Sequence, residues 1–237
     1  SYFAKVNNND AIGDKAAELM ALDSTLSAAD AAKLAKDMIL QDFILQRSEG
    51  IVNNIKAGFN NFADSSTVTF SSGANVEDYI LTKLNGYGLI DSTSNYNLVL
   101  DTEVGQLTDM ISEMKRLGMD DSQIDYLVDA MLFQSQQSAA ISLANHGVAH
   151  ITGDYMLQQQ LLAQMSQQLT PDQQKALLIT AVFHDMGYTS GLVSNMGTSF
   201  QFTTAHGWMS SMVTNDPDIS AKLADMFSSG NQEEMLN

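Results

Sequence analysis

Apolar residues recur at helical spacing along most of the chain, and this pattern predicts an all-α protein. An early stretch of it follows residues 27–30, whose residue types match a capping box at a helix start. The stretch runs to about residue 63, as one long helix or as two helices separated by a break near Gly50. Only two prolines occur in 237 residues, which also favours helices.

Later segments show the same spacing. Helices are expected over residues 76–84, over 101–118 and from Ser122 onward, where residues 122–125 again resemble a capping box. Residues 66–70 are different, because they are rich in Ser, Thr and Val and predict a short extended segment or a loop.

The clearest helix start is the sequence Thr-Pro-Asp-Gln that begins at Thr170. Thr170 can cap the helix, and Pro171 suits the first helical position because its missing amide hydrogen needs no partner there. Gln173 can return a hydrogen bond to the cap. The apolar residues that follow reach Phe183, and Gly187 is well placed to end the helix.

The chain contains no internal repeat and no low-complexity linker. Residues 1–120 form an N-terminal helical region to which we assign no role, and residues 121–237 form a helical domain that carries all four histidines. Methionines at helical spacing are interpreted as core residues. They include Met156, Met165, Met209 and Met212.

The chain is strongly acidic, with 28 Asp and Glu against 11 Lys and Arg and a net charge of −17. Such a surface repels phosphate backbones and anionic lipids, so nucleic-acid polymers and membranes are not expected as partners. The longest apolar stretch, residues 176–183, is too short to span a bilayer. A cytoplasmic protein is expected, and a homodimer is left open.

The histidines suggest where chemistry takes place. All of them fall between His146 and His206, and the chain has no cysteine, so a metal site would have to use nitrogen and oxygen donors. His184 and Asp185 are adjacent at the end of an apolar helix, and His146 and His150 have the spacing of one helix face. This spacing alone leaves metal or acid–base chemistry and structural packing as alternatives.

These residue types suit a hydrolytic metal site. Neutral imidazole and ionised carboxylate groups bind a divalent ion at neutral pH and leave positions open for water. The ion lowers the pKa of bound water to about 7, which makes a nucleophile available. A further histidine can then protonate the leaving group.

Residues 181–187, Ala-Val-Phe-His-Asp-Met-Gly, resemble the HD motif of the HD superfamily of metal-dependent phosphohydrolases. In that family an apolar helix ends in His-Asp. Residues 145–150, Asn-His-Gly-Val-Ala-His, are similar to the family's first-histidine helix. The resemblance covers about residues 140–215 and implies an all-α, HD-domain-like helical bundle with inward-facing ligands.

The resemblance also implies roles for individual residues. It implies His150, His184 and Asp185 as metal ligands, and His146 and Asp185 as catalytic residues. His206 resembles the histidine that opens the next helix in members with two ions; the alternative is a helix residue stacked near a tryptophan. One or two divalent ions are expected as cofactor, and Mn, Fe, Zn, Mg and Ni are not distinguished.

The chain departs from the family pattern in three respects. Tyr188 follows the glycine of the motif, where lysine is common. Gly153 and Asp154 replace a usual Arg-Val pair; we interpret Asp154 as a solvated helix residue, the alternative being a side chain that orients a histidine. The family's last ligand, a downstream aspartate, has no clear counterpart. The carboxylates past His206 that could serve are Asp216, Asp218 and Asp225.

The function implied is a phosphohydrolase or phosphodiesterase that acts on a small phosphate ester, such as a nucleotide or cyclic nucleotide. Cations that could neutralise such a substrate are sparse, with only Lys175 and Lys222 after residue 136. The N-terminal region could supply Arg47, Lys83, Lys115 or Arg116. Two alternatives remain: a helical binding or regulatory module that has lost catalysis, and an HD-type di-iron oxygenase, which the sparse cations and Tyr188 suit.

Overall fold

The computed structural model describes residues 8–46, 48–65, 70, 75–90, 98–140, 147–165, 168–189 and 201–227. Every regular element in these ranges is a helix, which confirms the all-α prediction. In chain order the helices are α2 (Asn9–Leu22), α3 (Ala28–Leu45), α4 (Ser48–Ser65), α5 (Val76–Gly86), α6 (Leu98–Arg116), α7 (Asp121–Ala140), α8 (Val148–Gln164), α9 (Pro171–Phe183), the 3-10 helix η1 (Met186–Thr189), α11 (Gln201–Thr214) and α12 (Pro217–Ala224).

Side-chain caps explain where two of the predicted helices begin. At the start of α9 the Thr170 hydroxyl accepts from the Gln173 backbone N–H at 3.3 Å, and the Gln173 side chain accepts from the Thr170 N–H at 2.9 Å. Pro171 occupies the first helical position, so the predicted start is confirmed. At α3, the Ser27 hydroxyl accepts from the Asp30 N–H at 3.1 Å.

Two local predictions were displaced by a few residues. The reciprocal pair at the start of α7 is Asp120 and Gln123, with bonds of 2.9 and 3.1 Å, so the capping box expected at Ser122 is wrong. The break between α3 and α4 falls before Gly50, which lies inside α4. One glycine costs a helix only about 1 kcal/mol relative to alanine, so Gly50 need not end it.

The predicted extended segment at 66–70 lies outside the described residues except for Phe70. Phe70 has no regular secondary structure and is 2% exposed. Its ring packs edge-on against Tyr79 of α5, with centroids 5.1 Å apart.

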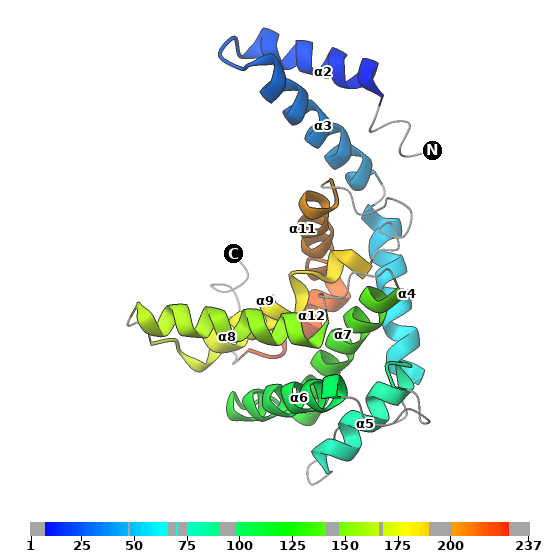
Figure 1. Cartoon of the computed structure of the whole chain (residues 1–237), viewed down its shortest axis with the longest axis vertical. Helices are drawn as coiled ribbons and strands as arrows, with labels where there is room; N and C mark the ends of the chain where they lie inside the picture. The colour runs from blue at the N-terminus through cyan, green and yellow to red at the C-terminus, as the bar shows by residue number, and fades with distance from the viewer. Residues whose placement is uncertain are drawn as a thin grey trace.

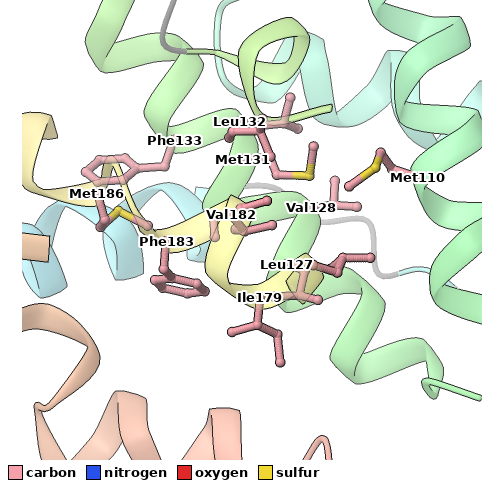
Figure 2. Packing of buried hydrophobic residues seen from close by; sticks show 14 of the residues in the cluster. Met110, Leu127, Val128, Met131, Leu132, Phe133, Ile179, Val182, Phe183 and Met186 are labelled. Atoms are coloured by element: carbon pink, nitrogen blue, oxygen red, sulfur yellow. The ribbon is translucent and has the colours of Figure 1, made fainter. Parts of the chain in front are cut away.

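Helix α7 lies at the centre of the helical body and contacts α4, α5, α6, α8, α9 and η1 (Figure 1). Figure 2 shows its side chains Leu127, Val128 and Met131 between Met110 of α6 and Val182 of α9. All five residues belong to one buried cluster, to which helices on both sides of residue 120 contribute. Burial of this apolar surface, worth roughly 25 cal/mol per Å², holds α9 against α7.

The first two described helices, α2 and α3, form a hairpin that extends from one end of the body (Figure 1). Ala16 of α2 and Ala31 and Ala35 of α3 form its small buried cluster, which is separate from the main core. Helix α3 also contacts α11. The hairpin therefore has a small cluster of its own, while Leu40 near the end of α3 belongs to the main core, and the hairpin lies away from α8 and α9 (Figure 1).

Of the four methionines interpreted as core residues, two are buried or packed against the core and two are exposed. Met209 is fully buried and Met212 packs against the core, as expected. Met156 and Met165 are 54% and 66% exposed, so their interpretation as core residues is wrong. Helix α8 buries Tyr155 and leaves these methionines solvent-exposed. Despite such exposed apolar residues, no helix in the described ranges has the length and hydropathy needed to cross a membrane.

Candidate metal centre

Two helix ends bring imidazole and carboxylate groups together. His150 lies in the first turn of α8, and Asp154 follows it at the i+4 position on the same helix face. His184 is the C-cap of α9, and Asp185 comes directly after it. Because α8 and α9 contact each other, the four side chains meet.

Each carboxylate in this group faces both imidazole rings. The Nε2 atom of His150 lies 2.9 Å from Oδ2 of Asp185 and 3.3 Å from Oδ2 of Asp154. The Nε2 atom of His184 lies 3.1 Å from Oδ2 of Asp154 and 3.3 Å from Oδ2 of Asp185. The ring centroids are 5.4 Å apart. We call these four residues the His-Asp cluster.

Three of the four residues in the His-Asp cluster have the spacing of ligands to a divalent ion. Donor atoms of His150, Asp154 and His184 lie within 4.8 Å of one another. Ligands of a tetrahedral ion with bonds of about 2.1 Å are separated by about 3.4 Å, close to the spacing observed here. Two neutral imidazoles and two carboxylates carry a charge that a divalent cation balances. The side chain of Asp185 is 5% exposed whereas that of His184 is 32% exposed, so solvent reaches one side of the cluster.

A backbone contact sets which nitrogen of His184 faces the cluster. Its Nδ1 lies 2.8 Å from the carbonyl oxygen of Ala181, which can only accept a hydrogen bond, so Nδ1 carries the hydrogen. The neutral ring therefore directs the lone pair of Nε2 at the carboxylates, as a metal ligand requires. A hydrogen bond to Asp185 raises the pKa of His184 against the opposing effect of burial.

Consecutive residues of α7 hold the two helix ends that carry the cluster. The Gln134 side-chain amide donates to the carbonyl oxygen of Val182 in the last turn of α9 at 2.6 Å. The Ser135 hydroxyl accepts from the Val148 backbone N–H in the first turn of α8 at 3.0 Å. Helix α7 therefore fixes the approach of α8 to α9 by polar contacts as well as by core packing.

The backbone at Gly147, the N-cap of α8, lies close to Ser135 of α7. A Cβ atom there would lie 2.7 Å from Oγ of Ser135 and 3.3 Å from its Cβ. An added Cβ would therefore require a shift of the Ser135 side chain or of the helix start. On the other side of the cluster, the Gly187 N–H donates to Oγ of Ser210 at 2.8 Å and ties the turn after Asp185 to α11.

The structure brings together His150, His184 and Asp185, which the sequence pattern predicted as ligands. Asp154, interpreted above as a solvated helix residue, belongs to the same cluster, so that interpretation is wrong. Its i+4 spacing from His150 was the signal that could have found it. His146 lies outside the described residues, and His206 lies in α11 with its side chain outside them.

The cations proposed from the N-terminal region have other partners. Lys83 is buried against Asp129, with Nζ 2.8 Å from Oδ1. Arg116 pairs with a glutamate of its own helix, and Lys115 lies over a phenylalanine ring at 4.4 Å. Arg47 lies outside the described residues. The three described cations are therefore engaged elsewhere, and none is placed to neutralise a substrate.

A cavity of about 500 Å³ opens beside the cluster and is lined by residues of α9, α11 and α12. His184 belongs to its lining, so the cavity and the His-Asp cluster share one side chain. Its volume falls within the range of roughly 300 to 1,000 Å³ that is usual for small-molecule sites.

A scan against protein-family models, a search of curated proteins and a search of solved structures each found no match to this chain. The resemblance to the HD superfamily therefore stays a prediction, and the geometry of the His-Asp cluster carries the functional argument.

Proposed function

We propose that this chain is a metal-dependent hydrolase of small phosphate esters, a phosphohydrolase or phosphodiesterase. The observation that carries the proposal is the convergence of His150, Asp154, His184 and Asp185 at two helix ends. Asp154 and Asp185 each face both imidazoles, and positive charge at the imidazoles or between the four groups stabilises both carboxylates. A divalent ion bound between the imidazole and carboxylate groups would supply such charge.

The residues have distinct roles in this proposal. A divalent ion would supply a Lewis acid that activates water and polarises the phosphoryl oxygen. His150 and His184 bind it through Nε2, and Asp154 and Asp185 contribute carboxylate oxygens. The contacts from α7 keep these donors at fixed separation, which lowers the cost of assembling the site. His146 keeps its predicted role of protonating the leaving oxygen.

Metal content tests the proposal. Protein loaded with Mn²⁺ and then dialysed should retain the ion, as measured by elemental analysis, and should hydrolyse p-nitrophenyl phosphate or its diester. The variants His184→Ala and Asp154→Asn should lose the metal and the activity together. Asp109→Asn provides a matched control, because Asp109 is an exposed aspartate on α6. Circular dichroism would verify that each variant is folded.

The outcomes separate the alternatives. Full metal occupancy in folded His184→Ala would overturn the proposal. Wild-type protein that binds no divalent metal would instead support a binding or regulatory module. Two bound irons with oxygen consumption, and no ester hydrolysis, would support the oxygenase.

A further inference from the structure

The cavity beside His184 has an uncharged lining. Among the described residues that line it there is no Lys, Arg, Asp or Glu, and His184 is the one titratable side chain. Its polar groups are hydroxyls and one carboxamide. They belong to Thr180, Ser210, Ser211, Thr214, Asn215 and Ser220. Apolar side chains such as Ile179 and Leu223 complete the lining.

The polar lining offers uncharged hydrogen-bond acceptors to a ligand. The Thr214 hydroxyl donates to the carbonyl oxygens of Ser210 and Ser211 at 3.2 and 3.1 Å, which leaves its oxygen able to accept. The Asn215 amide group donates to the carbonyl oxygen of Ser211 at 2.9 Å, so its own oxygen is available as an acceptor. Neutral acceptors of this kind match a ligand whose hydroxyl groups can donate hydrogen bonds.

The described lining of the cavity lacks the charged groups that bind a polyphosphate. Binding of phosphate groups relies on Arg, Lys, metal ions or clustered backbone N–H groups. Lys56, which lies near α12, is already paired with Asp216 at 2.9 Å and with Asp218 at 2.5 Å. Within the described ranges, the His-Asp cluster is therefore the candidate place for a phosphoryl group, and the cavity is a neutral space next to it.

We propose that this cavity binds the alcohol portion of the substrate, and that this alcohol is an uncharged, hydroxyl-bearing group such as a sugar or polyol. The inference rests on the proposed function and specifies its substrate class as a phosphate monoester of such an alcohol. Hydrolysis breaks the bond between phosphorus and the alcohol oxygen. Water supplies the hydroxyl group to phosphorus and a proton to the departing alcohol.

Gly207 allows the cavity to be filled without disturbing the core. It lines the cavity, is exposed, and a Cβ atom there would meet nothing within 4 Å. Leucine is also a better helix residue than glycine, so Gly207→Leu should fold. Gly105 in α6 is the matched control, because it is exposed and equally open around an added Cβ.

A second pair of variants tests the polar lining. The hydroxyls of Thr214 and Thr82 each donate to the carbonyl oxygen four residues earlier, at 3.2 and 2.7 Å. The substitutions Thr214→Val and Thr82→Val remove the same local bond, but only Thr214 lines the cavity. A difference between these two variants therefore reports on the cavity rather than on the helix.

Ligand-observed NMR on the metal-free protein provides the test, with methyl β-ribofuranoside as an uncharged hydroxylated probe. Cyclopentanol serves as an apolar probe and inorganic triphosphate as a charged competitor. We expect saturation transfer to the pentoside that is lost in Gly207→Leu, reduced in Thr214→Val, and retained in Gly105→Leu and Thr82→Val. Equal transfer in wild type and Gly207→Leu, equal transfer to cyclopentanol, or displacement by triphosphate would overturn the proposal.

Mn²⁺ binding, measured on the same proteins, keeps this inference separate from the proposed function. Mn²⁺ retention without pentoside binding overturns the assignment of the cavity alone. Pentoside binding that responds to Gly207→Leu in a protein that retains no Mn²⁺ supports the cavity as a ligand site. In that case its role for a substrate alcohol fails together with the hydrolase.

Discussion

Two clusters of carboxylates in this protein differ in where their positive charge comes from. Between α5 and α7, Nζ of Lys83 lies 2.9 Å from Asp125 and 2.8 Å from Asp129. The hydroxyls of Tyr79 and Tyr87 donate to the same two carboxylates at 2.7 and 2.9 Å. The side chains of Lys83 and Asp129 are 1% and 4% exposed and that of Asp125 is 19% exposed, so this cluster is largely buried and supplies its own cation.

The His-Asp cluster also contains two aspartates, yet its cationic position is filled by ionisable imidazoles. The side chains of His150 and Asp154 remain 30% and 32% exposed, so the cluster is open on one side. The buried ammonium group of Lys83 holds α5 and α7 together. The His-Asp cluster has ionisable imidazoles and is partly exposed, so a metal ion could replace a proton there. The contrast indicates why we assign stability to the first cluster and chemistry to the second.

Removal of Lys83 should have the largest effect on stability. The substitution Lys83→Met leaves two carboxylates, one of them buried, without their cation, which should cost about 3–5 kcal/mol of unfolding free energy. Urea unfolding measures this loss, and the exposed Lys33 gives a control, Lys33→Met, with a change within about 0.5 kcal/mol.

The Mn²⁺ affinity of folded Lys83→Met should match that of the wild type, although its unfolding free energy is lower. If Lys83→Met is too unstable to study, Lys83→Met with Asp129→Leu should recover part of the stability, because paired burial of apolar groups is tolerated better than an unpaired charge. A loss below about 1 kcal/mol, or a parallel loss of Mn²⁺ affinity in folded protein, would contradict the division of roles between the clusters.

The substitution Gly147→Ala should have an intermediate effect, a loss of Mn²⁺ affinity at the His-Asp cluster. The added Cβ in Gly147→Ala would lie 2.7 Å from Oγ of Ser135 and would displace the helix start that carries His150. We expect Mn²⁺ affinity to fall by about 10- to 100-fold, the usual effect of disturbing residues that support metal ligands. Isothermal titration calorimetry measures it.

Two further variants sharpen this prediction. Gly153→Ala lies in the same helix with nothing within 4 Å of the added Cβ, so its Mn²⁺ affinity should match wild type. Ser135→Ala in the Gly147→Ala background removes the oxygen in closest contact and should restore part of the affinity. Equal affinities for Gly147→Ala and Gly153→Ala would show that the close approach to α7 does not position the site.

The smallest effect concerns pH. Because the pKa of His184 is raised from 6.5, its protonated ring stabilises the metal-free folded protein. This contribution is fully present below the unfolded pKa and is lost as the pH rises through the raised folded pKa. Metal binding should show the reverse trend, since Mn²⁺ competes with the proton and gains affinity as the pH rises.

Urea unfolding in EDTA, over about pH 5.5 to about 8.5, measures the first trend. His184→Gln should flatten it, because the glutamine side chain does not titrate. An unchanged slope in this variant would assign the pH dependence to another group.

Local sequence signals predicted the fold best where several agreed. At the start of α9, Thr170, Pro171 and Gln173 each favour the same boundary, and the helix begins there. At α7 the neighbouring Asp120 and Ser122 are both good capping residues, so the pattern did not decide between them. The all-α class followed from periodicity, which depends only on residues close together in the chain.

The candidate site was predicted in part. His184 and Asp185 formed a recognisable pair at a helix end, and their convergence with His150 agrees with that prediction. The place of Asp154 depends on how α8 is rotated against α9, and this is set by contacts with α7 through Gln134 and Ser135. The i+4 spacing of Asp154 from His150 indicates a shared helix face, but long-range packing decides where that face points, and it also forms the cavity lined by three helices.

Anomalous scattering from Mn²⁺-loaded crystals tests the central claim most directly. We predict a peak about 2.0–2.3 Å from Nε2 of His150 and of His184. Carboxylate oxygens of Asp154 and Asp185 should complete the coordination. Crystals of folded protein that show no peak at this cluster, or a peak bound by other residues, would contradict it.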